Sequence, residues 1–504
     1  MRSRGSSRPL SKLTDARTTA RLSAGCNSVR LPYDRSRVSP GIVHLGVGAF
    51  HRAHVAVYVD EILKRDSSWG IIGASLRRSD TRNALAPQDF LYTVVARDGA
   101  ATTMRAIGSL LDVLDAHNQN RELIAAMTDP RIRIVSLTIT EKGYCHDPAT
   151  GALDPGHPDI LHDLANPTAP VSAPGLLVRA LELRRAAGIP PFTVLCCDNL
   201  PANGEVTARV VGSFARLRDT GLADFIAGEV AFPSSMVDRI VPATTDDDRR
   251  LVRETIGLHD AWPVVTEPYS QWVIEDRFPT GRPHFEAVGA ELVKDVRPYE
   301  LMKLRLLNGS HSTLAYLGYL AGYEFVSQAI AEPAFRTLID ELMTEEVMET
   351  LPRSVGDLSF YPAALLQRFA NPALKHRTWQ IAMDGSQKLP QRLLGTIRDR
   401  LARGKSITRA ALGVAGWMRY VAGVDEQGRR IDVQDPLAKR LRAIADEAEG
   451  LPARYVDGML RVSEVFGDEL AESHVLRENL TGHLASLYRH GALQTVRNVI
   501  GVGR

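Results

Sequence analysis

The sequence predicts an α/β protein: an N-terminal Rossmann-type domain followed by a mostly α-helical C-terminal domain. Short apolar runs alternate with helical patterns in the first 200 residues, as expected for a buried parallel sheet. A glycine-containing turn follows the first run, and from about residue 298 long helical periodicity replaces the β-rich runs. A chain of 504 residues is too long for one ordinary core, so we expect two or more domains.

The predicted strands share one feature, a polar segment directly after the apolar run. The first strand, residues 41–45, leads into Gly46-Val-Gly-Ala-Phe-His-Arg-Ala-His54 and then into a helical pattern that reaches Leu63. Strand, glycine turn and helix in that order are typical of a nucleotide-binding βαβ unit. Open α/β sheets bind ligands beyond the carboxyl ends of their strands, so the segments after the strands are candidate sites. The other strands are residues 69–76, 133–139 and 192–197.

The second domain is predicted from helical periodicity at residues 306–323, 335–351 and 410–421. We place the junction between Val288 and Pro298. The predicted domains are residues 41–294 and 295–504, and residues 1–40 form an extension that packs on or trails from the first domain.

The composition excludes several classes of partner. A formal charge of +2 gives no reason to expect nucleic acid or an anionic membrane, and no apolar run approaches the roughly 20 residues of a membrane helix. The four cysteines, Cys26, Cys145, Cys196 and Cys197, are too irregularly spaced for a disulfide framework or a zinc site and fit a reducing cytoplasm. We expect a small-molecule substrate. The oligomeric state is not predicted.

The glycine turn is the predicted cofactor site. Gly46 and Gly48 would let the backbone approach a pyrophosphate at the start of a helix. His51 replaces the third glycine of the usual pattern, so a turn without a ligand is the alternative. His51 and His54 could also ligate a metal, but no further ligand is evident nearby, and no metal is predicted. The cofactor-binding residues predicted here are Leu45, Gly46, Val47, Gly48, Ala49, Phe50, His51 and Arg52.

The residues after the second strand bear on the choice between NAD and NADP. An acid at this place binds the ribose hydroxyls of NAD, whereas arginines accommodate the phosphate of NADP. Here Arg77 and Arg78 precede Asp80. Arg78 and Asp80 are therefore predicted to bind the cofactor, with NAD first and NADP possible; the alternative is that both arginines face solvent.

Lys303, Asn308 and His311 form the predicted catalytic cluster. If their segment is an α-helix, about 100° per residue places them within one face of roughly 140°. A buried lysine can act as general base, and an amide donor can stabilise an alkoxide as hydride leaves, so the cluster suggests interconversion of an alcohol and a ketone. A solvated helix face is the alternative for these residue types.

Further candidates follow later strands. Glu141 could relay a proton, Asn199 could supply a second amide donor to the substrate oxygen, and Asp238 could accept from a substrate hydroxyl. Turn and cap roles, or an ion pair of Asp238 with Arg239, are the alternatives. In the helical domain, the basic residues Arg377, Lys388 and Arg392 could hold a substrate carboxylate or form structural ion pairs.

These segments together resemble the long-chain polyol dehydrogenases, the family of mannitol 2-dehydrogenase and fructuronate reductase. The resemblance runs from about Gly41 to Val433 and rests on Gly46-Val-Gly-Ala-Phe-His-Arg-Ala-His54, Thr138-Ile-Thr-Glu-Lys-Gly-Tyr144, Cys197-Asp-Asn199, Met236-Val-Asp-Arg-Ile240 and Lys303 with Asn308 and His311. It implies a Rossmann-type domain, a helical domain, a cleft between them and no metal. The motif that begins at Lys303 and residues 376–392 resemble the fructuronate reductase branch.

The resemblance also implies roles for the residues. Lys303 is the acid/base, Asn199 and Asn308 stabilise the oxyanion, His311 orients the substrate and Glu141 lies on the proton path. The implied reaction is the reversible reduction of D-fructuronate to D-mannonate. A mannitol 2-dehydrogenase or an arabinitol 4-dehydrogenase is the alternative within the family, and a non-catalytic nucleotide sensor is the alternative outside it. Arg78 stands where mannitol-specific members tend to have an acid, so NADP is kept as a second possible cofactor beside NAD.

Overall fold

The computed structural model describes residues 31–147 and 151–501 of the chain. The chain forms two compact units with a boundary between Val296 and Arg297, and each is described by itself. This boundary lies within the segment from Val288 to Pro298, where the sequence changes from β-rich to helical patterns. Most of the proposed N-terminal extension, including Cys26, lies outside the described residues.

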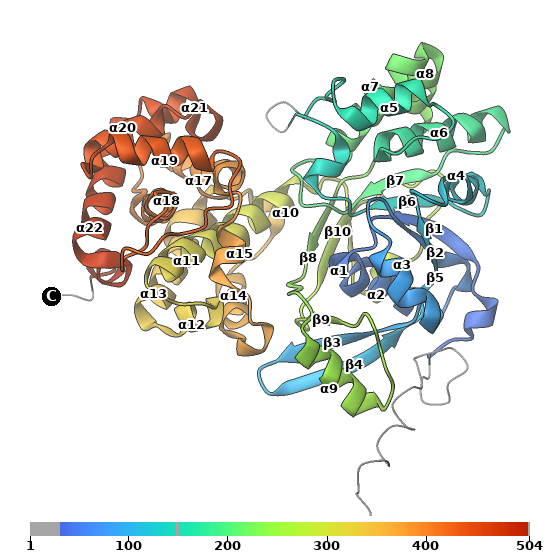
Figure 1. The fold of residues 1–504 in the computed structure, drawn as a ribbon, viewed down its shortest axis with the longest axis horizontal. Helices are drawn as coiled ribbons and strands as arrows, with labels where there is room; N and C mark the ends of the chain where they lie inside the picture. Colours follow the sequence, from blue (N-terminus) through green and yellow to red (C-terminus); the bar gives the residue numbers. More distant parts are fainter. Residues whose placement is uncertain (1–30, 148–150, 502–504) are drawn as a thin grey trace, which may run out of the picture. The chain divides into compact units, whose positions relative to one another are not determined.

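The first unit is built on a five-stranded parallel sheet with the strand order β5-β2-β1-β6-β7 (Figure 1). The four strands predicted from apolar runs are all present, within one or two residues at each end. The edge strand β5 was not predicted, because two aspartates interrupt its apolar pattern. The strands are β1 (Pro40–Leu45), β2 (Gly70–Ser75), β5 (Leu110–Asp115), β6 (Ile134–Leu137) and β7 (Thr193–Cys196).

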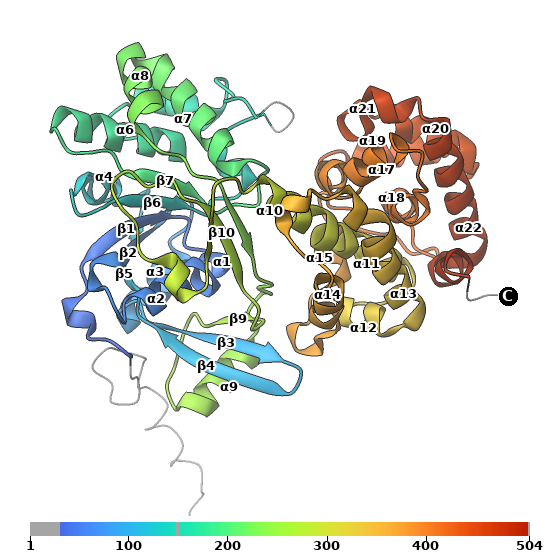
Figure 2. The ribbon, with the colours of Figure 1, turned by 180° about the vertical axis from the view of Figure 1, so that it is seen from behind.

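Both faces of this sheet are buried, which explains why its strands are continuously apolar. Alternate residues of the strands point to opposite faces. Val43, Val135 and Val194 pack with α4 (Asn120–Thr128), α6 (Ala173–Ala186), α7 (Asn203–Arg218) and α8 (Thr220–Glu229). Ile42, Ile134 and Leu195 pack on the other side with α2 (Val55–Ile62). Figure 2 shows these helices from behind.

Two smaller sheets complete the first unit. One has the order β11-β10-β8 and the other β4-β3-β9. The strands are β3 (Tyr92–Asp98), β4 (Ala101–Ile107), β8 (Ser235–Asp238), β9 (Val264–Thr266), β10 (Gln271–Glu275) and β11 (Glu291–Val293). The remaining helices are α1 (Ala49–Ala53), α3 (Asp80–Leu85), α5 (Pro158–Ala165) and α9 (Asp246–Ile256).

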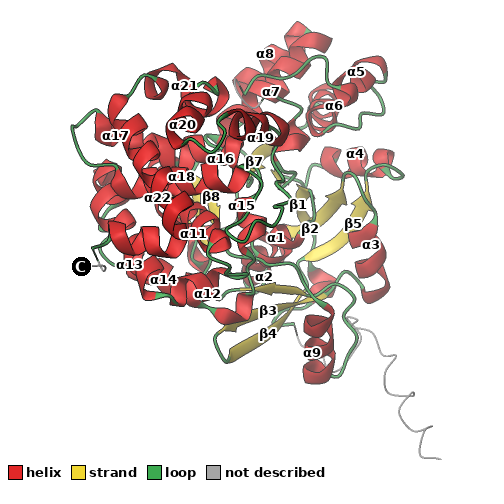
Figure 3. Ribbon diagram, turned by 60° about the vertical axis from the view of Figure 1, so that its left-hand side comes forward, coloured by secondary structure: helices red, strands yellow, loops and turns green. Residues whose placement is uncertain are grey.

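The second unit consists of helices and loops; all named strands of the described residues belong to the first unit (Figure 3). Two helices, α11 (Gly309–Leu320) and α18 (Thr408–Val421), are buried on almost every side and form its centre. The long helix α22 (His474–Val499) packs against α18. The other helices are α10 (Arg297–Met302), α12 (Val326–Ala331), α13 (Pro333–Glu341), α14 (Tyr361–Ala370), α15 (Thr378–Ala382), α16 (Gly385–Leu389), α17 (Gly395–Leu401), α19 (Ala438–Glu447), α20 (Pro452–Leu460) and α21 (Ser463–Ala471).

The predicted fold class, a Rossmann-type α/β domain followed by a mostly helical domain, is confirmed. Among the described residues, no helix combines the length and the apolar composition needed to cross a membrane.

Candidate functional site

The predicted site residues belong to both units. The glycine turn, Glu141, Asn199 and Asp238 lie in the first unit, whereas Lys303 and the rest of the catalytic cluster lie in the second. The two groups are therefore described in turn.

The glycine turn lies where the strand order of the parallel sheet reverses. Strand β1 pairs with β2 on one side and with β6 on the other, so its carboxyl end faces the crevice at which open α/β sheets bind ligands. Gly46 has φ +93°, and a Cβ atom there would lie 2.1 Å from the carbonyl oxygen of Thr138. At Gly48, by contrast, a Cβ atom would meet nothing within 4 Å. Gly46 is therefore required by the fold, while Gly48 leaves open space beside the turn, which suits a pyrophosphate.

Two helices follow the turn, and the helical pattern predicted after His54 corresponds to the second of them, α2. Helix α1 has only five residues, and His54, at φ −124° and ψ −90°, separates it from α2. The ring of His54 hydrogen-bonds the carbonyl oxygen of Gln271 at 2.9 Å, a contact between distant parts of the chain that local periodicity does not reveal.

His51, which replaces the third glycine, packs inside the first unit. Its ring stacks on that of His44 with 3.5 Å between centroids. Neither ring nitrogen of His51 has a hydrogen-bond partner. Burial, followed by the nearby His44, Arg52 and His54, lowers the pKa of His51 well below its usual value, so the ring is neutral.

His44 connects the middle of β1 to the glycine turn. Its ring nitrogens lie 2.8 Å from Ser136 Oγ and 2.8 Å from Thr138 Oγ1. The hydroxyl of Thr138 donates to the carbonyl oxygen of Gly46 at 2.7 Å, so it accepts from Nε2–H of His44, and Nδ1 accepts from Ser136. The network holds the turn against the end of β6. Sequence reasoning missed His44, although a histidine inside an apolar strand was a visible signal.

The other residues of the predicted cofactor site have structural side chains. Leu45 and Val47 are buried in the two cores, and Ala49 and Phe50 are half-buried. The guanidinium of Arg52 donates to the carbonyl oxygen of Trp262 and lies over the ring of Tyr92. The backbone of the turn and the exposed parts of Ala49 and Phe50 are available to a ligand.

Arg78 and Asp80 were predicted to bind the cofactor and to bear on the preference for NAD or NADP. In the structure they form an ion pair with each other. Arg78 Nε lies 3.0 Å from Asp80 Oδ2 at the start of α3, and both side chains are exposed. Arg77 pairs instead with Asp159 at 2.6 Å. The arrangement places an acid and an arginine together after β2 and does not favour either cofactor by itself.

Glu141, Asn199 and Asp238 follow or end strands β6, β7 and β8. Glu141 begins a short 3-10 helix (Glu141–Tyr144), and both Glu141 and Asn199 are exposed. Asp238 is the buried last residue of β8. The guanidinium of Arg239 donates to the carbonyl oxygen of Glu267 at 3.0 and 3.1 Å.

In the second unit, Lys303 begins a π-helical turn, η6 (Lys303–Asn308), between α10 and α11. The angle of roughly 140° calculated for a regular α-helix is therefore wrong for this segment. A π-helix bonds residue i to residue i+5, so the side chains of Lys303 and Asn308 lie closer to one face than in an α-helix. Lys303 is buried, with 8% of its surface exposed, which rules out a solvated helix face.

His311 lies on the first turn of α11 among aromatic and basic side chains. Its ring stacks on Phe369 and meets His376 edge-on, both with 4.9 Å between centroids. Its Nε2 is buried without a hydrogen-bond partner. Burial first, and then the nearby His376, Arg392, Arg368 and Lys388, lowers the pKa of His311 well below its usual value.

The three basic residues predicted to hold a carboxylate have different surroundings. Lys388 donates to the carbonyl oxygen of Met383 at 2.6 Å, and Arg392 donates to Ser312 Oγ at 3.0 Å, next to His311. Arg377 pairs with Glu324 at 3.3 Å, and about half of each side chain is exposed, 49% and 53%. Arg368 on α14, which sequence reasoning missed, adds a further positive charge near His311.

One group of possible metal ligands exists among the described residues. The ligand atoms of Cys145, His157 and Asp159 lie within 4.8 Å of one another. Asp159 pairs with Arg77, and His157 Nδ1 accepts the backbone N–H of Asp159. Burial raises the pKa of the Cys145 thiol to about 12, which disfavours the thiolate that a metal needs. These residues do not provide a prepared metal site.

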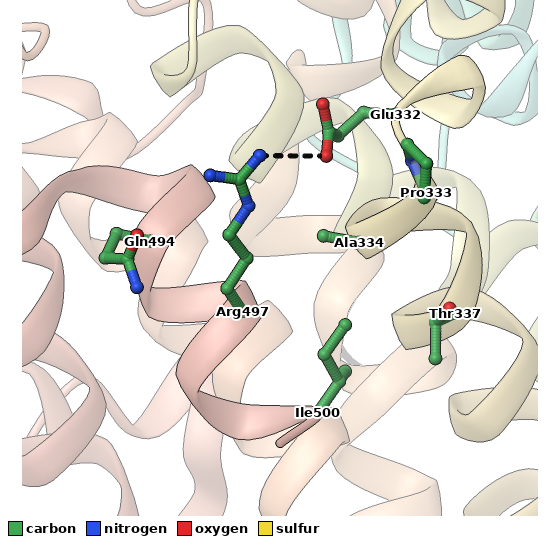
Figure 4. A pocket seen from close by; sticks show the side chains of 7 residues that line it. All are labelled: Glu332, Pro333, Ala334, Thr337, Gln494, Arg497 and Ile500. Carbon is green, nitrogen blue, oxygen red and sulfur yellow. Dashed lines mark hydrogen bonds and ion pairs between the residues drawn. The ribbon is translucent and has the colours of Figure 1, made fainter. Parts of the chain in front are cut away.

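A separate pocket of about 520 Å³ lies in the second unit between α13 and the end of α22 (Figure 4). Glu332 and Arg497 form an ion pair of 3.3 Å in its wall. The pocket contains none of the predicted site residues, and its two charged side chains are paired with each other. It is lined by Glu332, Pro333, Ala334, Thr337, Gln494, Arg497 and Ile500.

A glycine turn at the switch point of a parallel sheet is typical of a dinucleotide-dependent oxidoreductase, and the helical segment of the second unit carries a buried lysine, Lys303, a few residues before Asn308 and His311. Family models agree with this class. The mannitol dehydrogenase Rossmann domain matches residues 40–287, and the mannitol dehydrogenase C-terminal domain matches residues 295–488. The chain belongs to the mannitol dehydrogenase family, as the sequence motifs indicated.

Individual relatives are similar over nearly the whole chain. D-mannonate oxidoreductase of Escherichia coli K12 is 47% identical, and the match covers 93% of this chain and 97% of that protein. The uncharacterized oxidoreductase YdfI of the same organism is 49% identical, with 92% and 96% covered. The solved structure of Pseudomonas fluorescens mannitol 2-dehydrogenase in a ternary complex with NAD and D-mannitol is 40% identical, with a TM-score of 0.86 and 95% and 99% covered.

We expect substitution of the two glycines of the turn by alanine to have different effects on stability and on NADH affinity. Gly48→Ala should leave the stability nearly unchanged but weaken NADH binding about 10-fold or more, because its Cβ enters the open space beside the turn. Gly46→Ala should lower the stability, because its Cβ meets the backbone of Thr138. Gly99→Ala is the control: it also has a positive φ, but nothing lies within 4 Å. Thermal unfolding and NADH titration measure both effects; equal NADH affinity in Gly48→Ala and wild type would contradict the site.

Because His44 is buried, we predict that the unfolding free energy of the protein depends on pH. Burial lowers its pKa in the folded state to about 3, so the unfolded chain binds a proton below about pH 6.5 that the folded chain does not. The contribution of the neutral His44 ring to the unfolding free energy is complete above about pH 6.5. It decreases as the pH falls toward the folded-state pKa of about 3. Between pH 7 and pH 5 the wild type should lose about 2 kcal/mol more of its unfolding free energy than His44→Asn. Urea unfolding at both pH values measures this, and equal losses would exclude a neutral buried His44.

Proposed function

We propose that this enzyme reduces a keto sugar acid with NADH, most specifically D-fructuronate to D-mannonate, in a reversible reaction. The observation that carries the proposal is the concentration of positive charge around His311. Arg392 donates to Oγ of Ser312, the residue after His311, at 3.0 Å, and the charges of Arg392, Arg368 and Lys388 lower the pKa of the imidazole. A neutral polyol needs no such charge, whereas a carboxylate is bound by charge-assisted donors. The similarity to D-mannonate oxidoreductase supports the same substrate.

The proposed chemistry uses residues of both units. When bound at the glycine turn, NADH would supply the hydride that the ketone carbon of the substrate accepts. Lys303 Nζ donates a proton to the ketone oxygen, so that one hydride and one proton convert the ketone to an alcohol. The side-chain amides of Asn199 and Asn308 donate hydrogen bonds to that oxygen while negative charge develops on it.

The remaining residues orient the substrate and return the proton. The unpartnered Nε2 of His311 is available to a substrate hydroxyl, and Asp238 accepts from another. Lys388 binds the carboxylate, with Arg377 further out at the surface. Glu141, which is exposed, passes protons between solvent and Lys303. Lys303 is largely buried, so a relay residue would connect its amine with bulk solvent.

The cofactor is NAD. The Rossmann domain of the family and the open space at Gly48 fit a dinucleotide, and the exposed Asp80 can accept from the ribose hydroxyls. Arg78 beside it leaves NADP possible as a second cofactor, because its guanidinium can pair with a phosphate when it leaves Asp80.

The substrate is tested by initial rates of NADH oxidation with D-fructuronate and with D-fructose at matched concentrations, and again with NADPH. We expect D-fructuronate to be reduced much faster. Lys388→Met should raise KM for D-fructuronate about 10-fold or more, since a charge-assisted contact contributes roughly 1.5–3 kcal/mol. Its control, Lys405→Met, removes an exposed lysine of the same unit. Preference for D-fructose would instead indicate a mannitol 2-dehydrogenase, and D-arabinitol oxidation tests the arabinitol 4-dehydrogenase alternative.

Lys303→Ala tests the acid/base. We expect kcat to fall about 10²- to 10⁴-fold, the usual range for a general acid or base, while NADH affinity stays the same. Lys405→Ala, the exposed control, should leave both unchanged. Unchanged turnover in Lys303→Ala would remove this residue from the mechanism; absence of turnover in the wild type with any sugar acid or polyol would favour a nucleotide sensor.

A further inference from the structure

The carboxylate of Asp198 holds the loop that carries Glu141. Asp198 directly precedes Asn199, and its Oδ2 accepts from the backbone N–H of Ile139 at 2.9 Å and from the hydroxyl of Tyr144 at 2.7 Å. Its Oδ1 accepts from the backbone N–H of Thr140 at 3.0 Å. The three donors lie on both sides of Glu141 in the sequence. One side chain therefore ties the segment of Glu141 to the segment of Asn199.

The loop needs this support because its backbone is strained. Thr140 has φ +65° and ψ 163°, a conformation that β-branched residues rarely adopt. Hydrogen bonds to an ionised carboxylate are about twice as strong as those between neutral groups, so Asp198 can offset a cost of this kind. The hydroxyl of Tyr144 also lies 2.7 Å from Cys196 Sγ, which fixes the far end of the loop to β7.

Asn203 extends the same network to the strand of Asp238. Its side chain is fully buried, and its Nδ2 donates to the carbonyl oxygens of Asp198 at 3.0 Å and Ser235 at 2.7 Å. Its Oδ1 accepts from the backbone N–H of Ser235 at 3.0 Å. Ser235 is the first residue of β8, and Asp238 is the last. The three site residues of the first unit thus depend on one set of hydrogen bonds.

We propose that Asp198 is a positioning residue, whose carboxylate keeps Glu141 in a fixed place relative to Asn199 during turnover. This inference rests on the proposed function, in which Glu141 relays protons and Asn199 stabilises the oxyanion. Asp198 acts through these neighbours and not on the substrate. Asn203 maintains the backbone of Asp198 and the start of β8 in the same arrangement.

The test compares Asp198→Asn with Asp163→Asn. The carboxylate of Asp163 also accepts three hydrogen bonds from a loop of the first unit, from the N–H of Val171 at 2.7 Å and from the N–H and hydroxyl of Ser172 at 2.9 and 2.6 Å. Both variants place an amide against N–H donors and should lose similar stability. We expect kcat for D-fructuronate reduction to fall about 10- to 100-fold in Asp198→Asn alone, with NADH affinity unchanged, because small displacements of catalytic groups have effects of this size.

A double-mutant cycle tests whether Asp198 acts through Glu141. If it does, Asp198→Asn combined with Glu141→Gln should be about as slow as the slower single variant, because the two changes disable the same step. If the fold-losses in kcat of the two single variants multiply in the double variant, the proposal is overturned. Equal kcat in Asp198→Asn and Asp163→Asn would also overturn it. If Asp198→Asn does not fold, Tyr144→Phe removes one of the three hydrogen bonds and should show a smaller loss of kcat with the same non-additivity.

The outcomes also separate this inference from the proposed function. A slow Glu141→Gln with normal Asp198→Asn would overturn the positioning role and leave Glu141 as the relay. Unchanged kcat in Glu141→Gln would remove Glu141 from the proposed mechanism and this role of Asp198 with it. The substrate preference and the effect of Lys303→Ala are measured independently of both.

Discussion

The first unit depends on the close approach of β1 and β6 at their carboxyl ends. A Cβ atom at Gly46 would lie 2.1 Å from the carbonyl oxygen of Thr138, so only glycine allows the chain to turn there. The hydroxyl of Thr138 then bonds the carbonyl oxygen of Gly46, and His44 bonds Thr138 from inside the sheet. These contacts among Gly46, Thr138 and His44 also fix the glycine turn at the point where the strand order reverses.

Parallel pairing brings together residues that are far apart in the sequence. Strands β6 and β7 lie side by side, so the loops that follow them, with Glu141 and Asn199, begin at one edge of the sheet. The antiparallel pair of β8 with β10 leaves Asp238 at the end of a third strand. Asp198 and Asn203 then join these loops by hydrogen bonds, and the amide of the fully buried Asn203 has hydrogen-bond partners at both its nitrogen and its oxygen.

In the second unit, a local departure from the α-helix shapes the segment from Lys303 to Asn308. The π-helical turn of η6 widens the helix at Lys303 and brings residues five apart toward one face. Isolated π-turns occur frequently at functional sites, because the extra residue in the turn re-aims side chains without ending the helix. His311 follows on α11, where burial keeps its imidazole neutral and positive side chains surround it.

The sequence by itself determined the fold class, four strands of the main sheet, the glycine turn and the family, because apolar periodicity, glycine and short motifs are local signals. It also placed Lys303, Asn308 and His311 in one helical segment and predicted that they form a catalytic cluster. Only the tertiary structure decided the break at His54, the π-turn at Lys303, the pairing of Arg377 with Glu324, and the networks of His44 and Asp198. These features depend on contacts between segments distant in the sequence or on packing around a helix. Such contacts leave no periodic pattern in the sequence from which they could be predicted.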